Sequence, residues 1–382
     1  MLRPLWARRA FLLAASAGFL WTQHPDPGAL AVLAAFVLSG FGAAHLVRGA
    51  RGRLGAALYI VALTAAFIIL KRYEFLRLIP GDTLIAHALD LVGLSFIFFR
   101  QIHYVVDVSQ GAIAKLDPFA YLVYQLNPFS LLAGPIQRYQ TFAENWAALT
   151  PLTENASAVR RAYFRILVGV FKVAVVAEII LYSFHNAPEM HSALVFAWRF
   201  YLFPAYVYFN FAGYCDIVIA AARLFGIALP ENFDRPYLAR NMIEYWNRWH
   251  RSLTFWIRDY VFTPLYMAIA RSAPALAPHL VFACYFVALF LAGIWHGATW
   301  NFVIFGLLNA IGVSGAKIWE NVIIARAGRK GLRAYLESKP ILWLARIATF
   351  HFVCVTMVFL RPESTQDLLE ILGALRALAM GS

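Results

Sequence analysis

Two histidines stand in aromatic-rich stretches of a chain that is otherwise strongly apolar. His250 ends the run Tyr245–His250 (YWNRWH), and His296 belongs to the run Trp295–Asn301 (WHGATWN). An ionisable side chain in apolar sequence is costly, so it usually faces a helix-bundle interior or a watery cavity where it has a function. Because imidazole takes up and releases a proton near neutral pH, these two residues are the first candidates for chemistry.

Several kinds of chemistry are open to a histidine pair. A metal site normally needs three or more ligands, and the ten histidines are scattered along the chain, so we expect no metal. A serine nucleophile would lack its Gly-x-Ser-x-Gly signature. A proton relay stays open, because Asp107, Asp216 and Asp259 lie in or beside apolar stretches. General base catalysis is best supported: a neutral imidazole removes a proton from a hydroxyl as its oxygen attacks an activated acyl group. For either histidine, a purely structural hydrogen bond between helices is the alternative.

Composition places these histidines in a membrane protein. Of the 382 residues, 62% are hydrophobic and 14% are charged, whereas soluble domains carry about 25% charged residues. Lipid offers no partner to open backbone groups, so helices are the expected spanning elements. We predict an all-α, polytopic fold of roughly eight to eleven transmembrane, re-entrant and interfacial helices in one domain, residues 1–382. Continuous apolar runs predict spans at Ala29–Leu46, Leu54–Leu70, Ile166–Leu181, Leu280–Trp295 and Ile341–Leu360.

The charges indicate which partners to expect. The 33 Lys and Arg against 20 Asp and Glu give a net charge of +13. They lie in short loops between apolar runs, where attraction to anionic lipid headgroups explains them, so we expect membrane lipid and no nucleic acid. Arg3, Arg8 and Arg9 precede the apolar stretch Ala10–Trp21, which we interpret as a first membrane helix; a cleaved signal peptide is the alternative.

Some segments depart from plain spans. Arg100, His103 and Asp107 fall on one helical face and predict a polar stripe packed against other helices. In the long run Phe196–Gly226 we expect a break at Pro204, and Arg326–Arg333 is expected to be a basic loop.

The segment Asp234–Tyr266 is predicted to hold an amphipathic helix that starts near Asn241. Glu244 precedes Arg248 by four residues, the favourable order for an ion pair. Such a helix would lie in the headgroup plane or line a funnel, with its tryptophans as an interfacial belt. The two faces would be Arg240, Glu244, Arg248 and Arg251 on the polar side, and Met242, Ile243, Trp246, Trp249, Leu253 and Trp256 on the other.

Five groups of residues occur in order over more than half of the chain. They are Gly93–Phe96 with Tyr104–Val108; Asn127–Phe129 with Leu132–Tyr139; Phe211–Asp216 with Leu224–Gly226 and Asn232–Tyr237; Tyr245–Leu253 with Trp256 and Arg258–Tyr260; and Gly293–Asn301. With them, the core from Gly93 to Asn309 resembles the membrane-bound O-acyltransferases. The similarity is greatest to the bacterial branch of alginate O-acetyltransferases and the D-alanyl transfer protein of teichoic acids.

The resemblance implies a fold and a reaction. The fold would be a ring of helices around a thinned, funnel-like centre, where a cytoplasmic acyl donor and an extracytoplasmic acceptor meet through a tunnel. His296 would be the catalytic histidine and His250 the second, assisting residue. The donor would be a thioester, acetyl-coenzyme A or an acyl carrier protein, so no permanently bound cofactor is expected.

We therefore expect an O-acyltransferase of the bacterial inner membrane. It would move a short acyl group, most simply acetyl, to a hydroxyl of an extracytoplasmic polysaccharide or of a periplasmic partner protein. D-alanyl transfer to a cell-envelope polymer is one alternative, and a non-catalytic acyl or lipid transporter is another. The resemblance has departures, since Asn210, Ala212 and Asn309 replace residues usual in the family.

The expected roles are distributed as follows. His296 is the general base, and His250 orients the acceptor or stabilises charge at the reacting carbonyl. Arginine suits the donor's phosphates, although snorkelling to lipid phosphates is an alternative for each one. Asp259 and Asn301 could hold the histidines in their working tautomers, or simply pack. The candidate substrate-binding residues are Trp246, Asn247, Arg248, Trp249, Arg251, Arg258, Asp259, Trp295 and Asn301.

Overall fold

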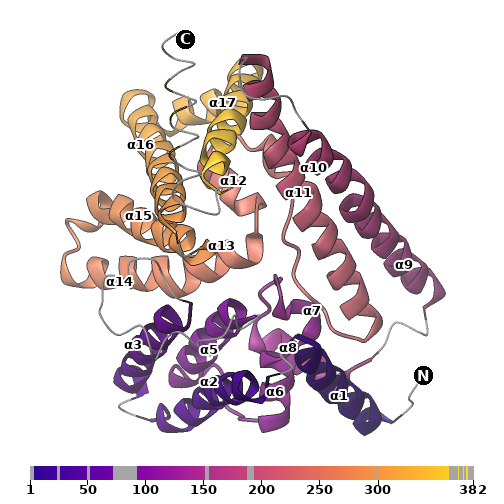
Figure 1. Cartoon of the computed structure of the whole chain (residues 1–382). Coiled ribbons are helices and arrows are strands. Elements are labelled where there is room, and N and C mark those ends of the chain that lie inside the picture. Colours follow the sequence, from indigo (N-terminus) through magenta and orange to yellow (C-terminus); the bar gives the residue numbers. More distant parts are fainter. Residues whose placement is uncertain are drawn as a thin grey trace. The chain divides into compact units, whose positions relative to one another are not determined.

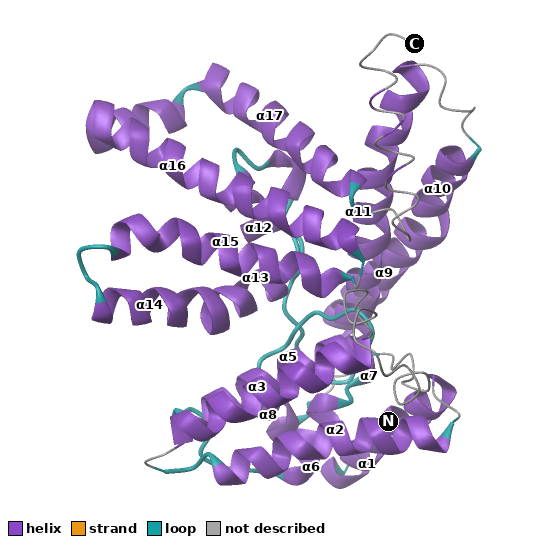
Figure 2. Ribbon diagram, turned by 60° about the vertical axis from the view of Figure 1, so that its left-hand side comes forward, coloured by secondary structure: helices purple, strands orange, loops and turns teal. Residues whose placement is uncertain are grey.

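The computed structural model describes residues 4–23, 26–49, 52–71, 93–150, 155–186, 193–297 and 299–360, with three isolated positions near the C-terminus. Every regular element in these ranges is a helix, and they contain no strand (Figure 2). The predicted all-α class is thereby confirmed. Residues 72–92, which precede the predicted polar stripe of Arg100, His103 and Asp107, lie outside the described residues.

Contacts divide the chain into two compact units, Met1–Gly169 with Cys215–Glu231, and Val170–Tyr214 with Asn232–Ser382. The single functional domain expected from the sequence stays a prediction. The first unit holds α1 (Leu5–Gln23), α2 (Pro27–Leu46), α3 (Gly52–Lys71), α5 (Leu94–Ser109), α6 (Pro118–Gln125), α7 (Pro128–Leu131), α8 (Tyr139–Ala148), most of α9 (Ala156–Phe171) and the end of α11 (Ala193–Leu224) (Figure 1).

The second unit holds the remaining elements. They are the π-helical turn η3 (Lys172–Ala177), α10 (Glu178–His185), most of α11, the 3₁₀ turn η4 (Pro236–Leu238), α12 (Met242–Arg248), α13 (Arg251–Ile257), the π-helical turn η5 (Arg258–Phe262), α14 (Thr263–Ser272), α15 (Ala277–His296), α16 (Trp300–Glu337) and α17 (Lys339–Val358).

Five helices of the described residues are long and apolar enough to cross a membrane. They are Pro27–Leu46, Gly52–Lys71, Ala197–Leu224, Trp300–Glu337 and Lys339–Val358, and Leu280–His296 is a shorter apolar helix. The chain is therefore a multi-pass membrane protein by length and composition. Four of the apolar runs recognised in the sequence coincide with α2, α3, α15 and α17, and the fifth, Ile166–Leu181, is covered by the end of α9 with η3 and α10. The ring of helices and its central funnel stay predictions.

The polar stripe of α5 is buried in the first unit, as predicted. Arg100 is 1% exposed and donates hydrogen bonds to the carbonyls of Tyr124, Gln125 and Ser130 at 2.6 to 2.9 Å. His103 is 0% exposed and lies 2.8 Å from the Tyr124 hydroxyl. The stripe therefore serves as a satisfied structural core, which is the condition for burying such groups.

One of two predicted interruptions is absent, and the other is shorter than expected. Helix α11 runs continuously through Pro204, whose carbonyl accepts a hydrogen bond from the Tyr237 hydroxyl at 2.6 Å. A proline removes one helical hydrogen bond, but packing around it can keep the helix intact. The expected basic loop Arg326–Arg333 is helical except for a break at Gly328 (φ 67°, ψ −178°), where two helices meet within α16.

Helices α15 and α16 approach each other closely enough to require glycine (Figures 1 and 2). A Cβ atom on Gly293 would lie 2.1 Å from the Gly306 Cα, and one on Gly306 would lie 2.9 Å from the Phe290 carbonyl oxygen. Both contacts are with backbone, so neither helix could yield by moving a side chain. This backbone contact fixes the last turn of α15, which carries His296.

Candidate active site

His250 occupies a sharp break between two short helices. Asn241 caps α12 as expected, its side chain accepting from the Glu244 amide at 2.8 Å. Trp249 is then extended, and His250 has φ 44° and ψ 49°, in the left-handed region. The prediction of a single helix from Asn241 onward is therefore wrong. The helical spacing of apolar and polar side chains continues past His250, but the helical backbone is interrupted at Trp249 and His250. A left-handed histidine is strained and persists only when its surroundings hold it.

Asn232 supplies much of that support. Its carbonyl accepts a hydrogen bond from the Arg251 amide at 3.0 Å, and its side-chain oxygen accepts from the Ser252 amide at 3.1 Å. Two residues on, the Asp234 amide donates to the Arg248 carbonyl at 3.0 Å. Asn232 is 0% exposed. The sequence indicated Asn232 only as part of the stretch Asn232–Tyr237. No sequence pattern shows that its side chain will accept a hydrogen bond from the backbone amide of Ser252.

The His250 side chain is buried among aromatic rings. It is 3% exposed, and its ring centroid lies 4.9 Å from Phe211 and 6.4 Å from Trp295. Its Nδ1 atom has no hydrogen-bond partner among the described residues. His250 lies outside the five candidate spans. Burial, helped by the charge of His296, lowers the pKa of His250 to about 3, so its imidazole is neutral at physiological pH.

His296 is the last residue of α15 and its tautomer is set by the helix itself. Its Nδ1 lies 2.6 Å from the Ala292 carbonyl oxygen. Because a carbonyl only accepts, Nδ1 must carry the hydrogen, and in the neutral ring the lone pair belongs to Nε2. The half-buried ring packs against Trp295 at 4.9 Å and Phe305 at 5.5 Å between centroids. That is the protonation pattern a general base requires.

The structure brings the two predicted histidines together around one indole. Both imidazoles contact the Trp295 ring, and His296 is close enough for its charge to lower the pKa of His250. Asn301 is 0% exposed near the start of α16, and Asp259 accepts from Arg258 at 2.8 Å. The proposed tautomer-holding roles of these two residues stay predictions. For His296, the backbone carbonyl of Ala292 already fills that role.

The tryptophans of this region are core residues and not an interfacial belt. Trp246, Trp249 and Trp256 are 3 to 5% exposed. The Trp249 ring stacks on Tyr245 at 5.7 Å, and the Trp246 indole donates to the Asn309 side chain at 3.2 Å. The sequence pattern marked these rings as one apolar face but could not show that other helices cover it.

The arginines fall into two groups. Arg240 and Arg248 both pair with Glu244, at 2.9 and 2.7 Å. Burial tends to raise the pKa of Glu244, but the hydrogen bonds from these arginines outweigh it, and the net pKa lies below the usual range. The predicted Glu244–Arg248 pair is thus present, and it occupies the Arg248 guanidinium.

The second group shares an aromatic ring. The guanidinium groups of Arg251 and Arg258 lie 5.5 and 4.8 Å from the Phe255 ring centroid. Arg258 is exposed and pairs with Asp259. In the described part of the chain, Arg251 has no carboxylate partner. Arg251 is therefore better placed than Arg248 to meet an incoming anion, and Arg258, although paired with Asp259, is more exposed than Arg248, 56% against 28%.

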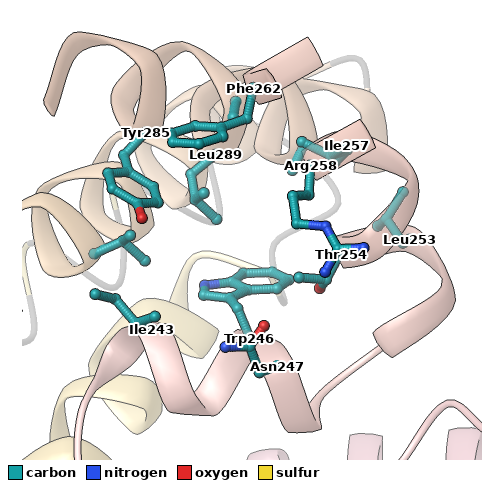
Figure 3. A pocket seen from close by; sticks show the side chains of 13 residues that line it. Ile243, Trp246, Asn247, Leu253, Thr254, Ile257, Arg258, Phe262, Tyr285 and Leu289 are labelled. Carbon is teal, nitrogen blue, oxygen red and sulfur yellow. The ribbon is translucent and has the colours of Figure 1, made fainter. Parts of the chain in front are cut away.

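A cavity of about 270 Å³ is lined by residues between Ile243 and Val313, the part of the chain that contains both histidines. Neither histidine lines it, but Ala292 does, one helical turn before His296. In Figure 3 the Trp246 indole projects into the cavity, with Tyr285 on one side and Arg258 on the other. The lining residues are Ile243, Trp246, Asn247, Leu253, Thr254, Ile257, Arg258, Phe262, Tyr285, Ala288, Leu289, Ala292 and Val313.

The comparisons with known proteins agree with these features. The model of the membrane-bound O-acyltransferase family matches residues 58–359. The chain belongs to this family. The match extends beyond the core recognised at Gly93–Asn309, and it makes the chain an acyltransferase. Within the described residues, no group of three His, Cys, Asp or Glu side chains is placed to hold a metal ion.

Relatives within the family carry different names. Teichoic acid D-alanyltransferase of Streptococcus thermophilus is 28% identical over 283 residues, covering 71% of this chain and 68% of its own. Peptidoglycan O-acetyltransferase of Helicobacter pylori is 27% identical over 315 residues, covering 75% and 56%. "Probable alginate O-acetylase AlgI" of Azotobacter vinelandii is 30% identical over 288 residues, covering 73% and 52%. The chain thus spans about half the length of the two O-acetylating relatives.

Proposed function

We propose that this acyltransferase moves an acetyl group from a cytoplasmic thioester to a hydroxyl of a cell-envelope polysaccharide, or to a periplasmic partner protein, at the bacterial inner membrane. One observation carries the proposal. His296 donates through Nδ1 to Ala292, so in the neutral ring the basic lone pair is on Nε2. The names of the peptidoglycan and alginate relatives support acetyl as the group and a polysaccharide as the acceptor.

The reaction follows from that lone pair. The Nε2 of His296 removes the proton of the acceptor hydroxyl while its oxygen attacks the thioester carbonyl. The new C–O bond forms, the C–S bond breaks, and the leaving thiolate takes the proton back from the imidazolium. A thiolate leaves easily, so direct transfer needs no covalent acyl-enzyme.

His250 has a different role from His296. A general base works best with a pKa near the working pH. The pKa of His250 is about 3, so His250 is poorly suited to remove a proton from the acceptor. Its neutral ring can instead hydrogen-bond the acceptor or the carbonyl oxygen that becomes negative in the transition state. The buried Nδ1 atom, which has no partner in the described part of the chain, is suited to that contact.

The cavity next to Ala292 would receive the donor. At about 270 Å³ it is at the small end for a ligand site, which suits a short acyl group on a narrow arm. Trp246 and Asn247 line it, as does Arg258. The phosphates of coenzyme A would lie near the two guanidinium groups on Phe255, because charge-assisted contacts to phosphate are the strong ones. The donor is a co-substrate, and no permanent cofactor is required.

D-alanyl transfer from a carrier protein is the second candidate. It is favoured by the coverage of the Streptococcus thermophilus relative, 68% of whose length this chain spans, against 52 to 56% for the two O-acetylating relatives. A transporter without chemistry of its own would not need the tautomer that the Ala292 carbonyl imposes on His296.

Transfer of a labelled acyl group tests these alternatives. The full chain in lipid nanodiscs is given labelled acetyl-coenzyme A or a D-alanyl-loaded carrier protein, with alginate, peptidoglycan and teichoic acid as acceptors. We expect acetyl transfer, lowered roughly 10²- to 10⁴-fold by His296→Ala. His351→Ala is the matched control, because His351 also contacts the carbonyl four residues earlier, Ile347, at 2.8 Å, but is exposed on α17. Equal rates in folded wild type and His296→Ala would overturn the proposal, and transfer from the carrier alone would establish the second candidate.

A further inference from the structure

The first unit contains a second cavity, unrelated to the histidines. Its volume is about 370 Å³, and it lies between the start of α9, the last turns of α11 and the segment after α11. Arg165 joins the two helices here, through a 2.8 Å ion pair with Asp216 of α11. The lining includes Ala158, Arg161, Arg165, Arg223, Leu229 and Glu231.

The charges of this cavity do not cancel. Arg165 is fully engaged: both terminal nitrogens donate to the Glu231 carboxylate at 2.6 Å, and Nε donates to Asp216. Arg161 is exposed and contacts only the Ser157 hydroxyl, at 3.2 Å, among the described residues. The exposed Arg223 guanidinium has no partner there at all. Three arginines and two carboxylates thus leave one net positive charge at the cavity, and Arg161 and Arg223, which pair with neither carboxylate, are placed to bind an anion.

Both helices change character at the level of this cavity. On α9, charged residues such as Arg161 give way to the exposed apolar side chains of Phe164 and Leu167, which are 67% and 66% exposed. On α11, the candidate span Ala197–Leu224 ends next to Arg223. Arginines where an apolar helix surface begins or ends lie at the depth of lipid headgroups.

We propose that this cavity binds the headgroup phosphate of an anionic phospholipid. Arg161 and Arg223 donate to the phosphate oxygens, and Arg165, held by its two carboxylates, forms the rigid wall between them. The acyl chains lie along the exposed apolar face of α9 at Phe164 and Leu167. Guanidinium groups suit such a site, because their forked donors match phosphate geometry.

Native mass spectrometry of the full chain tests the site. The chain is purified in detergent, stripped of lipid, and titrated with phosphatidylglycerol or phosphatidylcholine. We expect a tightly held phosphatidylglycerol, and a roughly thirtyfold weaker one in the variant Arg161→Gln/Arg223→Gln, because each arginine contributes about fivefold to anionic lipid binding. Arg326→Gln/Arg329→Gln removes the same charge from exposed positions of α16 and should leave binding unchanged.

The other outcomes overturn the proposal. Equal retention of phosphatidylglycerol in both double variants would mean that the cavity does not bind it. Displacement by inorganic phosphate as effective as that by phosphatidylglycerol would make the site one for a soluble anion. If the Arg161→Gln/Arg223→Gln variant keeps the lipid but loses an acidic acyl carrier protein, the arginines form a protein-docking surface instead. Both substituted side chains are exposed, so the variant should fold, which an unchanged unfolding temperature would verify.

Discussion

His250 packs against Trp295, with ring centroids 6.4 Å apart, and Trp295 is the residue directly before His296. The two imidazoles are thereby close enough to interact electrically: a proton on His296 makes one on His250 harder to add. With its pKa lowered to about 3, mainly by burial, His250 stays neutral at physiological pH. This asymmetry separates their roles, and it can be measured.

The folding stability of the protein should depend on pH because of His250. Its pKa is about 3 in the fold against 6.5 in a free histidine. As the pH falls below 6.5, the unfolded chain gains a proton that the folded chain refuses, so stability falls from about pH 6.5 towards pH 3. The contribution of one such group is about 1.4 kcal/mol per pH unit. Above pH 6.5 it has no effect.

Thermal unfolding in detergent at a series of pH values checks this dependence. His250→Asn removes the titrating group, and asparagine tolerates the left-handed backbone, so the variant should lose less stability than wild type as the pH is lowered. His351→Asn, at an exposed position, should follow the wild-type curve. Parallel curves for wild type and His250→Asn would contradict the assignment.

Asn232→Ala should lower both the stability of the fold and the rate of catalysis. It removes the acceptor of the Ser252 amide, at a cost of about 1–3 kcal/mol for a buried unsatisfied group, and it loosens the backbone on which His250 is strained. Asn241→Ala is the matched control, since it removes the cap of α12 for about 1 kcal/mol without touching that backbone.

We expect kcat to fall roughly tenfold or more in Asn232→Ala, to be largely restored in Asn232→Asp, and to stay near wild type in Asn241→Ala, because only the first loses the acceptor that positions His250. Steady-state transfer rates and unfolding temperatures on the same preparations provide both numbers. If the rate follows the unfolding temperature alike in all three variants, Asn232 is merely structural.

Gly293→Ala should disrupt the packing of α15 against α16 that positions His296. Its new methyl group would meet the Gly306 backbone at 2.1 Å, so α15 and α16 would have to separate. Gly315→Ala, on the same α16, meets nothing within 4 Å and should stabilise the helix by about 0.5–1 kcal/mol. Unfolding temperatures of the pair would test this, and equal values would contradict the close approach.

Arg251→Gln and Arg258→Gln should raise the KM for acetyl-coenzyme A about tenfold or more with little change in kcat, because they remove charge-assisted contacts to phosphate. Acetyl-pantetheine, which lacks the phosphates, supplies the discriminating control: its KM should be the same in wild type and variants. Arg333→Gln, at a side chain that is 82% exposed, should alter neither donor. An equal rise of KM for both donors would place these arginines away from the phosphates.

The predictable features of the fold are the local ones. Asn241 as a helix cap and Glu244 pairing with Arg248 depend on spacing along one helix, and both are present. The polar stripe of α5 is likewise visible in its periodicity. Helix length and apolarity identified α2, α3 and α17 for the same reason.

The features that the sequence did not reveal depend on distant partners. The left-handed turn at His250 is held by Asn232, and the burial of Trp246 depends on Asn309 of α16. Pro204 was expected to break a helix that tertiary contacts keep whole. Even the tautomer of His296 depends on a backbone carbonyl, a group that every residue has and that no sequence pattern distinguishes.

The path of the chain between its compact units limits how the protein can be divided. The chain passes from one unit to the other after Gly169, after Tyr214 and after Glu231, and the second passage lies inside α11. No single cut can therefore yield two autonomous halves. Any recombination between family members that exchanged one unit alone would need three junctions, two of them inside the helices α9 and α11, so these units should be inherited together.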